Sequence, residues 1–449
     1  MKYGLIGEKL GHSFSVSIHN SFGNPDYILR EIPKDELDEF MQKKGFLGIN
    51  VTIPYKQDVM KYCVLDEAAK EIGAVNTVIN RDGVLYGYNT DAFGLAAMMD
   101  HAVCGECAKR EDCRNTEIDF SGRDAIILGA GGTAKTALYV LNKKNARTVT
   151  LLVRDVEKAK ESFAGKNVSV FSLEEELPEY VKNAEVLVNT TPVGMYPKNE
   201  ASPVSLSEFP KLKSVFDVVY NPLTTELIAE AKGKGLSAAN GLYMLVMQAL
   251  MAERLFFPED DSLHNFGLHN FSLHNDEFGR EVYSDLRKKL TNIVLIGMPG
   301  SGKSTLGKIM SAKLSREFAD TDEEFEKAFG TAPGACIVAE GEEEFRRKET
   351  ETVRKIAVRN SQVIATGGGV VTREANIKAC KQNGIIVYIK RDISNLSSEG
   401  RPLSKGDGAI EKLYEARKEL YEAAADIIVE VKEDDPEKTA EEILSRLGF

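Results

Sequence analysis

The sequence has few cysteines and no long uninterrupted apolar run. Six cysteines in 449 residues exclude a disulfide framework. The richest apolar stretch, 241–252, contains Gln248 and is followed by Glu253 and Arg254, so it is too short and too polar to cross a membrane. The first residues also lack the apolar segment of a signal peptide. We therefore expect a cytoplasmic protein without a membrane partner.

The sequence also lacks a basic excess, because its formal net charge is −12 at pH 7. Nucleic-acid binding requires Lys and Arg that neutralise phosphates, so no nucleic-acid partner is expected. A few well-placed cations can still bind an anionic small molecule. At about 150 residues per domain, the length suggests roughly three domains. The sequence leaves the oligomeric state open.

Short apolar runs alternate with helical stretches along most of the chain. Residues 1–100 mix β-branched runs with polar helical segments, as in an α/β lobe. Further strands are predicted at 125–128, 148–153, 186–189 and 215–219, and a later series at 292–297, 363–365 and 385–389. A helix is expected from Thr136. Strands that alternate with helices twice over predict parallel sheets in separate domains of an α/β protein.

Two stretches fit neither pattern. Leu-His-Asn recurs with a period of five within 258–285, which matches no helix, strand or solenoid, so a polar linker is predicted. Its histidines are an alternative metal site: His264, His269 and His274. A second cluster could form a Cys3His zinc site, although its short spacing favours a solvent-facing loop: His101, Cys104, Cys107 and Cys113.

A P-loop sequence, GMPGSGKS from Gly297 to Ser304, follows the predicted strand at 292–297. Its glycines let backbone N–H groups face phosphates, and the next helix adds the positive end of its dipole. Lys303 is expected to reach the β- and γ-phosphates, and Ser304 to bind Mg²⁺. The residues expected around ATP are Gly300, Ser301, Gly302, Lys303, Ser304 and Thr305. The pattern predicts phosphate transfer from ATP.

Downstream residues supply groups for an acceptor. Asp320 and Asp322 alternate along a segment expected to be extended, so they should share one face. One carboxylate can bind Mg²⁺ while the other orients an acceptor hydroxyl. The segment 341–349 supplies an Arg for a planar anion, and the glycines at 367–369 allow close backbone approach. Arg401 lies in a Gly/Ser-rich stretch that is typical of a mobile lid.

Together, the segments GMPGSGKST, DTD, GEEEFRRKE, TGGG and RPL, with the ending from Arg417 to Asp426, resemble shikimate kinase over residues 291–449. The resemblance implies conversion of shikimate and ATP to shikimate 3-phosphate and ADP. It assigns shikimate contacts to Asp322, Arg346, Gly368 and Arg417. The two arginines would clamp the carboxylate, and Asp322 would assist deprotonation of the attacking hydroxyl. Arg401 would close over the ATP phosphates, and Asp320 is assigned with Ser304 to Mg²⁺.

A dinucleotide turn follows the predicted strand at 125–128. It fits G-x-G-x-x-[GA], with the residues Gly129, Ala130, Gly131, Gly132 and Thr133. Arg154 would suit a 2′-phosphate, whereas Asp155 would suit a bare 2′-hydroxyl. Lys56 and Asp91 could relay a proton while hydride moves to or from a nicotinamide. Unrelated surface charges are the alternative for this pair.

Residues 1–257 resemble shikimate dehydrogenase through segments that include NVTIPYK, NTDAFG and GAGGTA. The resemblance implies that Lys56 and Asp91 are the catalytic pair. It assigns substrate contacts to Ser13, Ser15, Thr52, Asn76, Asp91, Tyr220 and Gln248. It places the dinucleotide against Gly129–Thr133, Val218 and Gly241. The usual adenosine turn keeps only Arg154, so NADP is expected and NAD stays open.

The domain division that follows is a substrate lobe at 1–100 completed by a helix at 241–257, a Rossmann-like lobe at 101–240, a linker at 258–290 and a kinase domain at 291–449. The predicted function is bifunctional: reduction of 3-dehydroshikimate with NADP(H), then phosphorylation of shikimate with ATP and Mg²⁺. Two alternatives are a dehydrogenase domain that acts on quinate, and a regulator that senses pathway metabolites with these domains.

Overall fold

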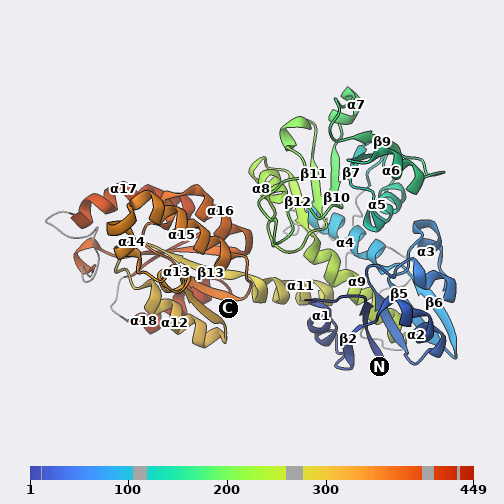
Figure 1. Ribbon diagram of the computed structural model, residues 1–449, viewed down its shortest axis with the longest axis horizontal. Coiled ribbons are helices and arrows are strands. Elements are labelled where there is room, and N and C mark those ends of the chain that lie inside the picture. Colours follow the sequence, from blue (N-terminus) through green and yellow to red (C-terminus); the bar gives the residue numbers. More distant parts are fainter. Residues whose placement is uncertain (12, 105–118, 259–276, 397–408, 432–434) are drawn as a thin grey trace. The chain divides into compact units, whose positions relative to one another are not determined.

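The computed structural model describes residues 1–11, 13–104, 119–258, 277–396, 409–431 and 435–449. These residues form two compact units, Met1–Leu286 (unit 1) and Arg287–Phe449 (unit 2), each of which is described by itself. Figure 1 follows the chain through both. The described residues contain three β-sheets flanked by helices, which confirms the predicted α/β class.

The first lobe of unit 1 has a mixed sheet in the order β2-β1-β3-β5-β6-β4. The strands β1, β2 and β3 are parallel, but β5 pairs antiparallel with β3 and β6. The sequence marks this reversal, because Asp82 and Gly83 both have positive φ in the two-residue turn between β5 and β6. The elements are β1 (Tyr3–Gly7), α1 (Ser15–Ser21), β2 (Tyr27–Glu31), α2 (Leu37–Lys43), β3 (Gly48–Val51), β4 (Val64–Leu65), α3 (Glu67–Ile72), β5 (Thr77–Arg81) and β6 (Val84–Tyr88).

The second lobe has a fully parallel sheet in the order β12-β11-β10-β7-β8-β9. Apart from Asp124, the residues of its central strands are buried, as expected where helices cover both faces. The predicted strands at 125–128, 148–153 and 186–189 are confirmed. The elements are β7 (Asp124–Leu128), α5 (Gly132–Lys143), β8 (Thr148–Val153), α6 (Val156–Ser162), β9 (Ser169–Ser172), α7 (Glu179–Lys182), β10 (Val186–Asn189), β11 (Ser214–Asp217), α8 (Glu226–Gly233) and β12 (Ser237–Asn240).

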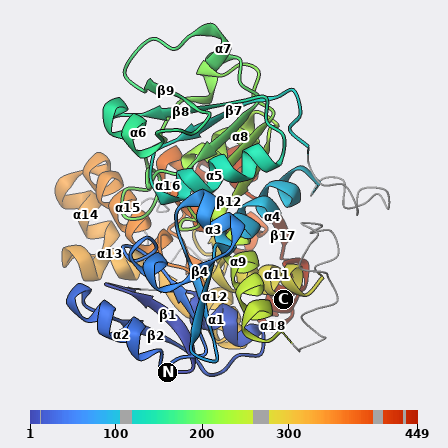
Figure 2. The same ribbon diagram turned by 90° about the vertical axis from the view of Figure 1, so that its right-hand side faces the viewer.

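Two long helices, α4 (Thr90–Cys104) and α9 (Gly241–Phe256), lie side by side between the two sheets of unit 1 (Figures 1 and 2). Their approach depends on Gly94, because a Cβ there would clash with the carbonyl oxygen of Met244. The end of α9 reaches the first sheet, where Phe256 fills the space beside Gly48 and its ring lies 5.3 Å from that of Tyr3. Two helices from distant parts of the sequence thus join the lobes.

Unit 2 has a parallel sheet in the order β14-β15-β13-β16-β17. The predicted strands at 292–297, 363–365 and 385–389 are confirmed. The elements are β13 (Asn292–Ile296), α12 (Lys303–Leu314), β14 (Glu317–Asp320), α13 (Thr321–Phe329), α14 (Pro333–Glu340), α15 (Glu342–Ala357), β15 (Gln362–Ala365), α16 (Glu374–Asn383), β16 (Gly384–Lys390), α17 (Ala409–Ala424), β17 (Ile427–Glu430) and α18 (Pro436–Arg446).

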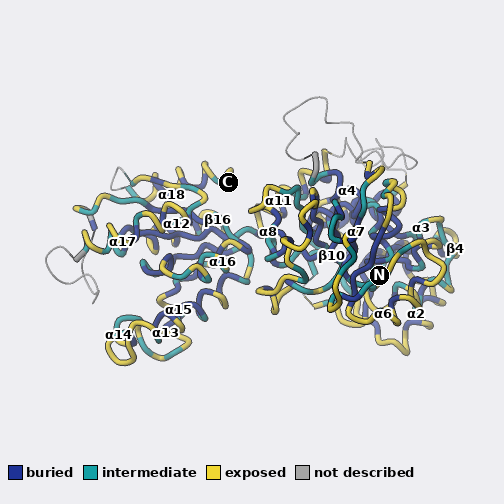
Figure 3. The backbone as a smooth tube through the Cα atoms, turned by 90° about the horizontal axis from the view of Figure 1, so that it is seen from above, coloured by how far each residue is buried: buried dark blue, intermediate teal, exposed yellow. Residues whose placement is uncertain are grey.

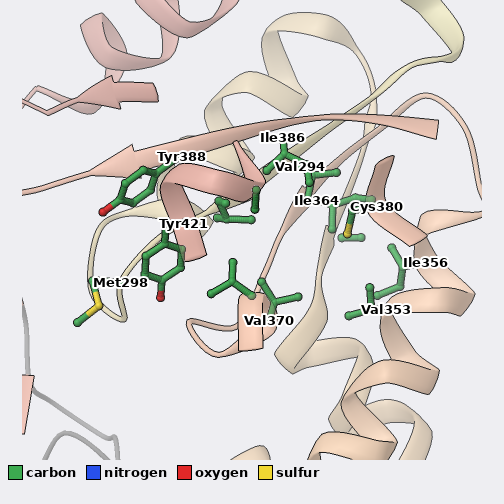
Figure 4. Packing of buried hydrophobic residues seen from close by; sticks show 14 of the residues in the cluster. Val294, Met298, Val353, Ile356, Ile364, Val370, Cys380, Ile386, Tyr388 and Tyr421 are labelled. Atoms are coloured by element: carbon green, nitrogen blue, oxygen red, sulfur yellow. The ribbon is translucent and has the colours of Figure 1, made fainter. Parts of the chain in front are cut away.

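Hydrophobic side chains on one face of the unit 2 sheet form a continuous core. Its strands are the buried centre of the unit, with exposed residues on the outer faces of the helices (Figure 3). Within this core the rings of Tyr388 and Tyr421 stack at 5.0 Å, next to Val370 (Figure 4). Val370 directly follows the glycines at 367–369. The packing of Val370 in this core therefore holds the adjacent glycine segment in place.

The interval expected as a linker is partly helical. Residues Glu277–Leu290 form α11, and within unit 1 the ring of Phe278 packs on Phe22 at 5.3 Å while Tyr283 packs on Tyr243 at 4.9 Å. Phe278 and Tyr283 give the start of α11 an apolar side that polar composition alone did not reveal. His264, His269 and His274 lie outside the described residues. None of the described helices is long and apolar enough to span a membrane.

Candidate active sites

Lys56 and Asp91 come together in unit 1, although they lie 35 positions apart in the sequence. Lys56 follows β3, and Asp91 lies in the first turn of α4. The Nζ of Lys56 donates a 2.5 Å hydrogen bond to Oδ2 of Asp91, and Nδ2 of Asn76 donates to Oδ1 at 2.9 Å. The side chains remain 26% and 16% exposed, so a ligand can reach them. The surface-charge alternative is therefore wrong for this pair.

Other expected substrate residues lie on several different segments of unit 1. Gln248, on α9, accepts a hydrogen bond from the Thr90 hydroxyl at 3.4 Å. Ser13 donates to the hydroxyl of Ser15 at 3.0 Å at the start of α1. The remaining expected residues, Thr52 and Tyr220, are half-buried. Burial raises the pKa of the Tyr220 phenol, so it is a neutral hydroxyl near pH 7.

A buried chain of hydrogen bonds, which the motifs did not predict, leads from β2 to Asn76, the residue that donates to Asp91. Tyr27 donates to Oδ1 of Asn50 at 2.7 Å, and Asn50 donates to the hydroxyl of Thr77 at 2.9 Å. The Thr77 and Thr90 hydroxyls are 3.1 Å apart, and Asn76 donates to Thr90 at 3.0 Å. Asn50 is the first residue of the NVTIPYK segment, and a polar side chain in an otherwise apolar strand is the signal that points to a buried hydrogen-bonding role.

The dinucleotide turn connects the end of β7 to the start of α5. Gly129 has φ of +100°, which favours glycine, and the space in front of Gly131 and Gly132 is open. The α5 N-terminus therefore presents backbone N–H groups to an anion. Gly241 is packed so closely on the Val218 carbonyl that a Cβ would clash there. The open glycines and the α5 N-terminus fit the phosphates of a dinucleotide.

Arg154, which would suit a 2′-phosphate, and Asp155, which would suit a 2′-hydroxyl, differ in their surroundings. Asp155 caps α6, because its Oδ1 accepts a 3.1 Å hydrogen bond from the backbone N–H of Lys158. Arg154 is exposed at the end of β8.

The P-loop of unit 2 has the expected strand–loop–helix form. Gly300 and Gly302 have φ of +82° and +93°, and Lys303 is buried with its Nζ donating to the carbonyls of Gly297 and Met298 at 2.9 Å. Ser304 donates to Oδ2 of Asp320 at 2.6 Å. A hydroxyl and a carboxylate side by side fit the coordination sphere of Mg²⁺. The loop residues and Asp320 thus fit ATP with its metal.

The P-loop opens into a cavity of about 510 Å³ that also contains the expected acceptor residues. Arg346 and Arg417 are both buried, and Nη1 of Arg417 donates to the carbonyl of Gly368 at 3.1 Å. Tyr421 donates to the same carbonyl. The structure therefore brings together Asp322, Arg346, Gly368 and Arg417, four expected residues from different elements.

The expectation that Asp320 and Asp322 share one face of an extended segment is wrong. Asp320 ends β14 and caps α13, accepting a 3.0 Å hydrogen bond from the backbone N–H of Asp322, which lies in the first helical turn. Both residues nevertheless line the cavity. An N-cap aspartate stops the strand at this point, and alternation along the sequence does not reveal that stop.

Glu349 is a site residue that the sequence reasoning missed. It is only 4% exposed and accepts a 2.8 Å hydrogen bond from Nη1 of Arg346. Burial raises the pKa of its carboxyl, and the positive charge of Arg346 opposes that rise. Glu349 lies three residues after Arg346 on α15, and this spacing could have identified it.

Several predictions concern residues whose side chains are not described. Arg401, Cys107 and Cys113 lie outside the described residues, and only the backbone of Cys104 is described. His101 lies on α4 rather than in the favoured loop, and its ring stacks on Tyr243 at 4.1 Å. In the part of the chain that the structure describes, no three or more His, Cys, Asp or Glu side chains are grouped as metal ligands.

Three family models match the chain. The shikimate dehydrogenase substrate binding domain matches residues 5–78, shikimate / quinate 5-dehydrogenase matches 112–208, and shikimate kinase matches 299–448. The arrangement is that of a dehydrogenase followed by a P-loop kinase.

Known proteins resemble unit 1 over nearly their whole length. A shikimate dehydrogenase (NADP(+)) of Clostridium perfringens strain SM101 is 40% identical over 263 residues, which cover 57% of this chain and 91% of the relative. A chorismate mutase/shikimate 5-dehydrogenase fusion protein from Clostridium acetobutylicum is 32% identical with a TM-score of 0.50, covering 63% and 96%. A shikimate dehydrogenase in complex with NADP+ is 30% identical with a TM-score of 0.50, covering 63% and 94%.

The chain belongs to the shikimate dehydrogenase family and carries a shikimate kinase domain after it. It is a fusion of two enzymes of the shikimate pathway, an oxidoreductase and a kinase.

Proposed function

We propose that unit 1 interconverts 3-dehydroshikimate and shikimate with Lys56 and Asp91 as its catalytic pair. The hydrogen bond between their side chains carries this proposal. Bound NADP(H) supplies or accepts the hydride. Lys56 moves the matching proton at the substrate oxygen, and Asp91 holds the ammonium in place. Ser13, Ser15, Thr52, Asn76, Tyr220 and Gln248 orient the carboxylate and hydroxyls of the ring.

NADP is the cofactor that we propose for unit 1, bound against Gly129–Thr133, Val218 and Gly241. Asp155 supports this choice because its carboxylate caps α6, while the exposed Arg154 is available for a 2′-phosphate. The shikimate dehydrogenase relatives named above carry NADP in their descriptions. NAD is the alternative.

We propose that unit 2 transfers the terminal phosphate of ATP to the 3-hydroxyl of shikimate. The cavity that joins the P-loop to the acceptor residues supports this. Arg346 and Arg417 bind the carboxylate, and Asp322 orients the attacking hydroxyl. Lys303 binds the phosphates, and Ser304 with Asp320 holds Mg²⁺, which neutralises charge on the phosphates. Arg401 is the proposed lid residue.

The domain division proposed from the sequence remains our proposal: residues 1–100 with 241–257 for the substrate, 101–240 for the dinucleotide and 291–449 for the kinase. Quinate is a second candidate substrate for the dehydrogenase, since one matching family model is described as shikimate / quinate 5-dehydrogenase. A regulator without activity is disfavoured because Lys56, Asp91, Lys303, Ser304 and Asp322 are all present.

The experiment is a matrix of shikimate and quinate against NADP⁺ and NAD⁺, with ADP formation from ATP measured on the same protein. We expect reduction of NADP⁺ with shikimate and shikimate-dependent ADP formation. Faster reduction with quinate would favour the second candidate. No turnover with any pair would refute the dehydrogenase proposal, and no shikimate-dependent ADP would refute the kinase proposal.

A further inference from the structure

Asp217 is a fully buried acid that neither proposed reaction uses. It ends β11 and is 0% exposed, as is Asn189 at the end of the neighbouring strand β10. Its Oδ1 accepts hydrogen bonds from Nδ2 of Asn189 at 2.9 Å and from the backbone N–H of Val219 at 3.1 Å. Its Oδ2 accepts from the hydroxyl of Thr225 at 2.7 Å. One side chain thus connects three segments at the carboxyl edge of the sheet.

The Asn189 contact extends to the dinucleotide turn. With its Nδ2 held by Asp217, Asn189 presents Oδ1 to the backbone N–H and the hydroxyl of Thr191, at 3.0 and 2.7 Å. A Cβ on Gly129 would lie 3.0 Å from Cγ2 of Thr191 and 3.1 Å from the hydroxyl of Thr190. The turn formed by 189–191 is therefore the wall against which Gly129 packs, and its conformation depends on Asn189.

The hydrogen bonds from Val219 and Thr225 to Asp217 position the segment around Val218 and the start of α8. The bond from Val219 to Asp217 fixes the backbone around Val218, whose own N–H donates to the carbonyl of Asn189 at 3.0 Å. Val218 in turn packs on Gly241, where α9 begins. Thr225 caps α8, accepting a 3.3 Å hydrogen bond from the N–H of Ile228. A shift of Asp217 would therefore move both proposed sides of the cofactor site.

We propose that Asp217 is a positioning residue for the dinucleotide: it holds the 189–191 turn against Gly129 and the Val218 backbone against Gly241, so that both are preformed before the cofactor binds. Preformed contacts avoid the ordering cost of binding, so Asp217 acts chiefly on cofactor affinity. This inference rests on the proposed NADP site. It adds a residue that does not itself touch the dinucleotide.

The chemistry of the site predicts which substitutions are tolerated. Asp217→Ala leaves the donors of Asn189 and Val219 without this acceptor. Asp217→Asn can still accept both bonds at its amide oxygen and can donate to the Thr225 hydroxyl from its nitrogen. A positioning role therefore predicts that Asp217→Ala weakens NADPH binding and that Asp217→Asn largely retains it.

The test measures the dissociation constant of NADPH by fluorescence titration of the full chain, with and without these substitutions. We expect Asp217→Ala to raise it about tenfold, the equivalent of one lost hydrogen bond to a charged or buried group, and Asp217→Asn to leave it within about threefold of the wild type. At saturating NADP⁺ the kcat for shikimate oxidation should change little in either variant.

A second pair keeps the test decisive if Asp217→Ala does not fold. Thr225→Val removes the hydroxyl that donates to Asp217, and Thr225→Ser keeps it, at a position outside the proposed cofactor contacts. We expect weaker NADPH binding in the first and wild-type binding in the second. Lower thermal stability with an unchanged dissociation constant in Asp217→Ala and Thr225→Val would overturn the positioning role. Failure of the wild type to bind NADPH would instead refute the proposed cofactor site itself.

Discussion

Arg346 and Arg347 are adjacent on α15 but have different environments. Arg346 is 6% exposed in the acceptor cavity, where it contacts Glu349, whereas the side chain of Arg347 is 57% exposed and pairs with Glu344 on the helix surface. Of these two neighbours, we therefore assign the carboxylate contact to Arg346, which shares the cavity with Arg417. A guanidinium can donate two parallel hydrogen bonds to a carboxylate, whereas an ammonium binds it as a point charge.

Arg346→Lys keeps the charge but loses the fork, so we expect the KM for shikimate in the kinase reaction to rise about tenfold or more, with the KM for ATP nearly unchanged. Arg347→Lys is the matched control and should leave both constants unchanged. Steady-state kinetics of ADP formation provides the measurement. Equal effects of the two substitutions would contradict the assignment.

The burial of Asp217 should also make the stability of unit 1 depend on pH. Burial raises the pKa of its carboxyl to about 6 in the folded protein, above the usual 3.8. The folded state then binds more protons than the unfolded state between these values, so the contribution to stability falls as pH rises and is lost above about pH 6. Asp217→Asn cannot titrate. Between pH 4 and 7 the wild type should lose about 2 kcal/mol more stability than this variant.

The difference is best measured by hydrogen exchange of peptides from β10 and β11, because these report on this sheet alone. Other carboxylates titrate equally in both proteins, so they cancel in the comparison. Parallel pH profiles for the two proteins would show that Asp217 is already ionised throughout this range, and would contradict the prediction.

Among the helices, the packing of α4 against α9 matters most for the dehydrogenase site. Asp91 lies at the start of α4 and Gln248 in the middle of α9, so their separation depends on how closely the two helices pack. Gly94 allows that approach beside the carbonyl of Met244. A larger residue at this position would push the helices apart.

Gly94→Ala should therefore lower the stability of unit 1 by about 1–3 kcal/mol and raise the KM for shikimate in the dehydrogenase reaction. Gly233→Ala is the matched control: Gly233 lies in α8, where an added Cβ meets nothing within 4 Å. The control should be neutral or slightly stabilising. Denaturant unfolding and dehydrogenase kinetics on both variants test this. An unchanged KM for shikimate in Gly94→Ala would contradict the prediction, because it would show that the packing of α4 on α9 does not affect substrate binding.

Local sequence patterns were sufficient for the elements that depend on local chemistry. The glycine-rich turns, the strands before them and the alternation of strands with helices follow from periodicity and backbone freedom, and the structure has them. The mixed first sheet, the partly helical linker and the helical position of Asp322 depend on hairpin pairing, apolar contacts of α11 and capping by Asp320.

The candidate sites divide in the same way. Lys56, Lys303 and the acceptor arginines stand in motifs whose chemistry is readable from residue type. Asn50 and Asp217 are buried polar residues whose partners lie far away in the sequence, and their importance appears only when burial is known.

At the scale of the whole molecule, the chain carries two sites whose proposed reactions share a metabolite. The proposed product of unit 1 is the proposed substrate of unit 2. Each unit contains its own cofactor elements: the Gly129 turn in one and the P-loop around Lys303 in the other. Since neither set of site residues crosses from one unit to the other, the two activities should be separable by single substitutions.

The most direct test measures both activities on the full chain and on two variants, Lys56→Ala and Lys303→Ala. Shikimate-dependent NADP⁺ reduction and shikimate-dependent ADP formation are followed on the same folded preparations. We expect Lys56→Ala to lower the first by about 10²–10⁴-fold and to leave the second unchanged, because it removes only the group proposed to accept the proton of the shikimate hydroxyl. We expect Lys303→Ala to do the reverse. If either substitution silenced both activities in a folded protein, the account of two independent sites on one chain would be contradicted.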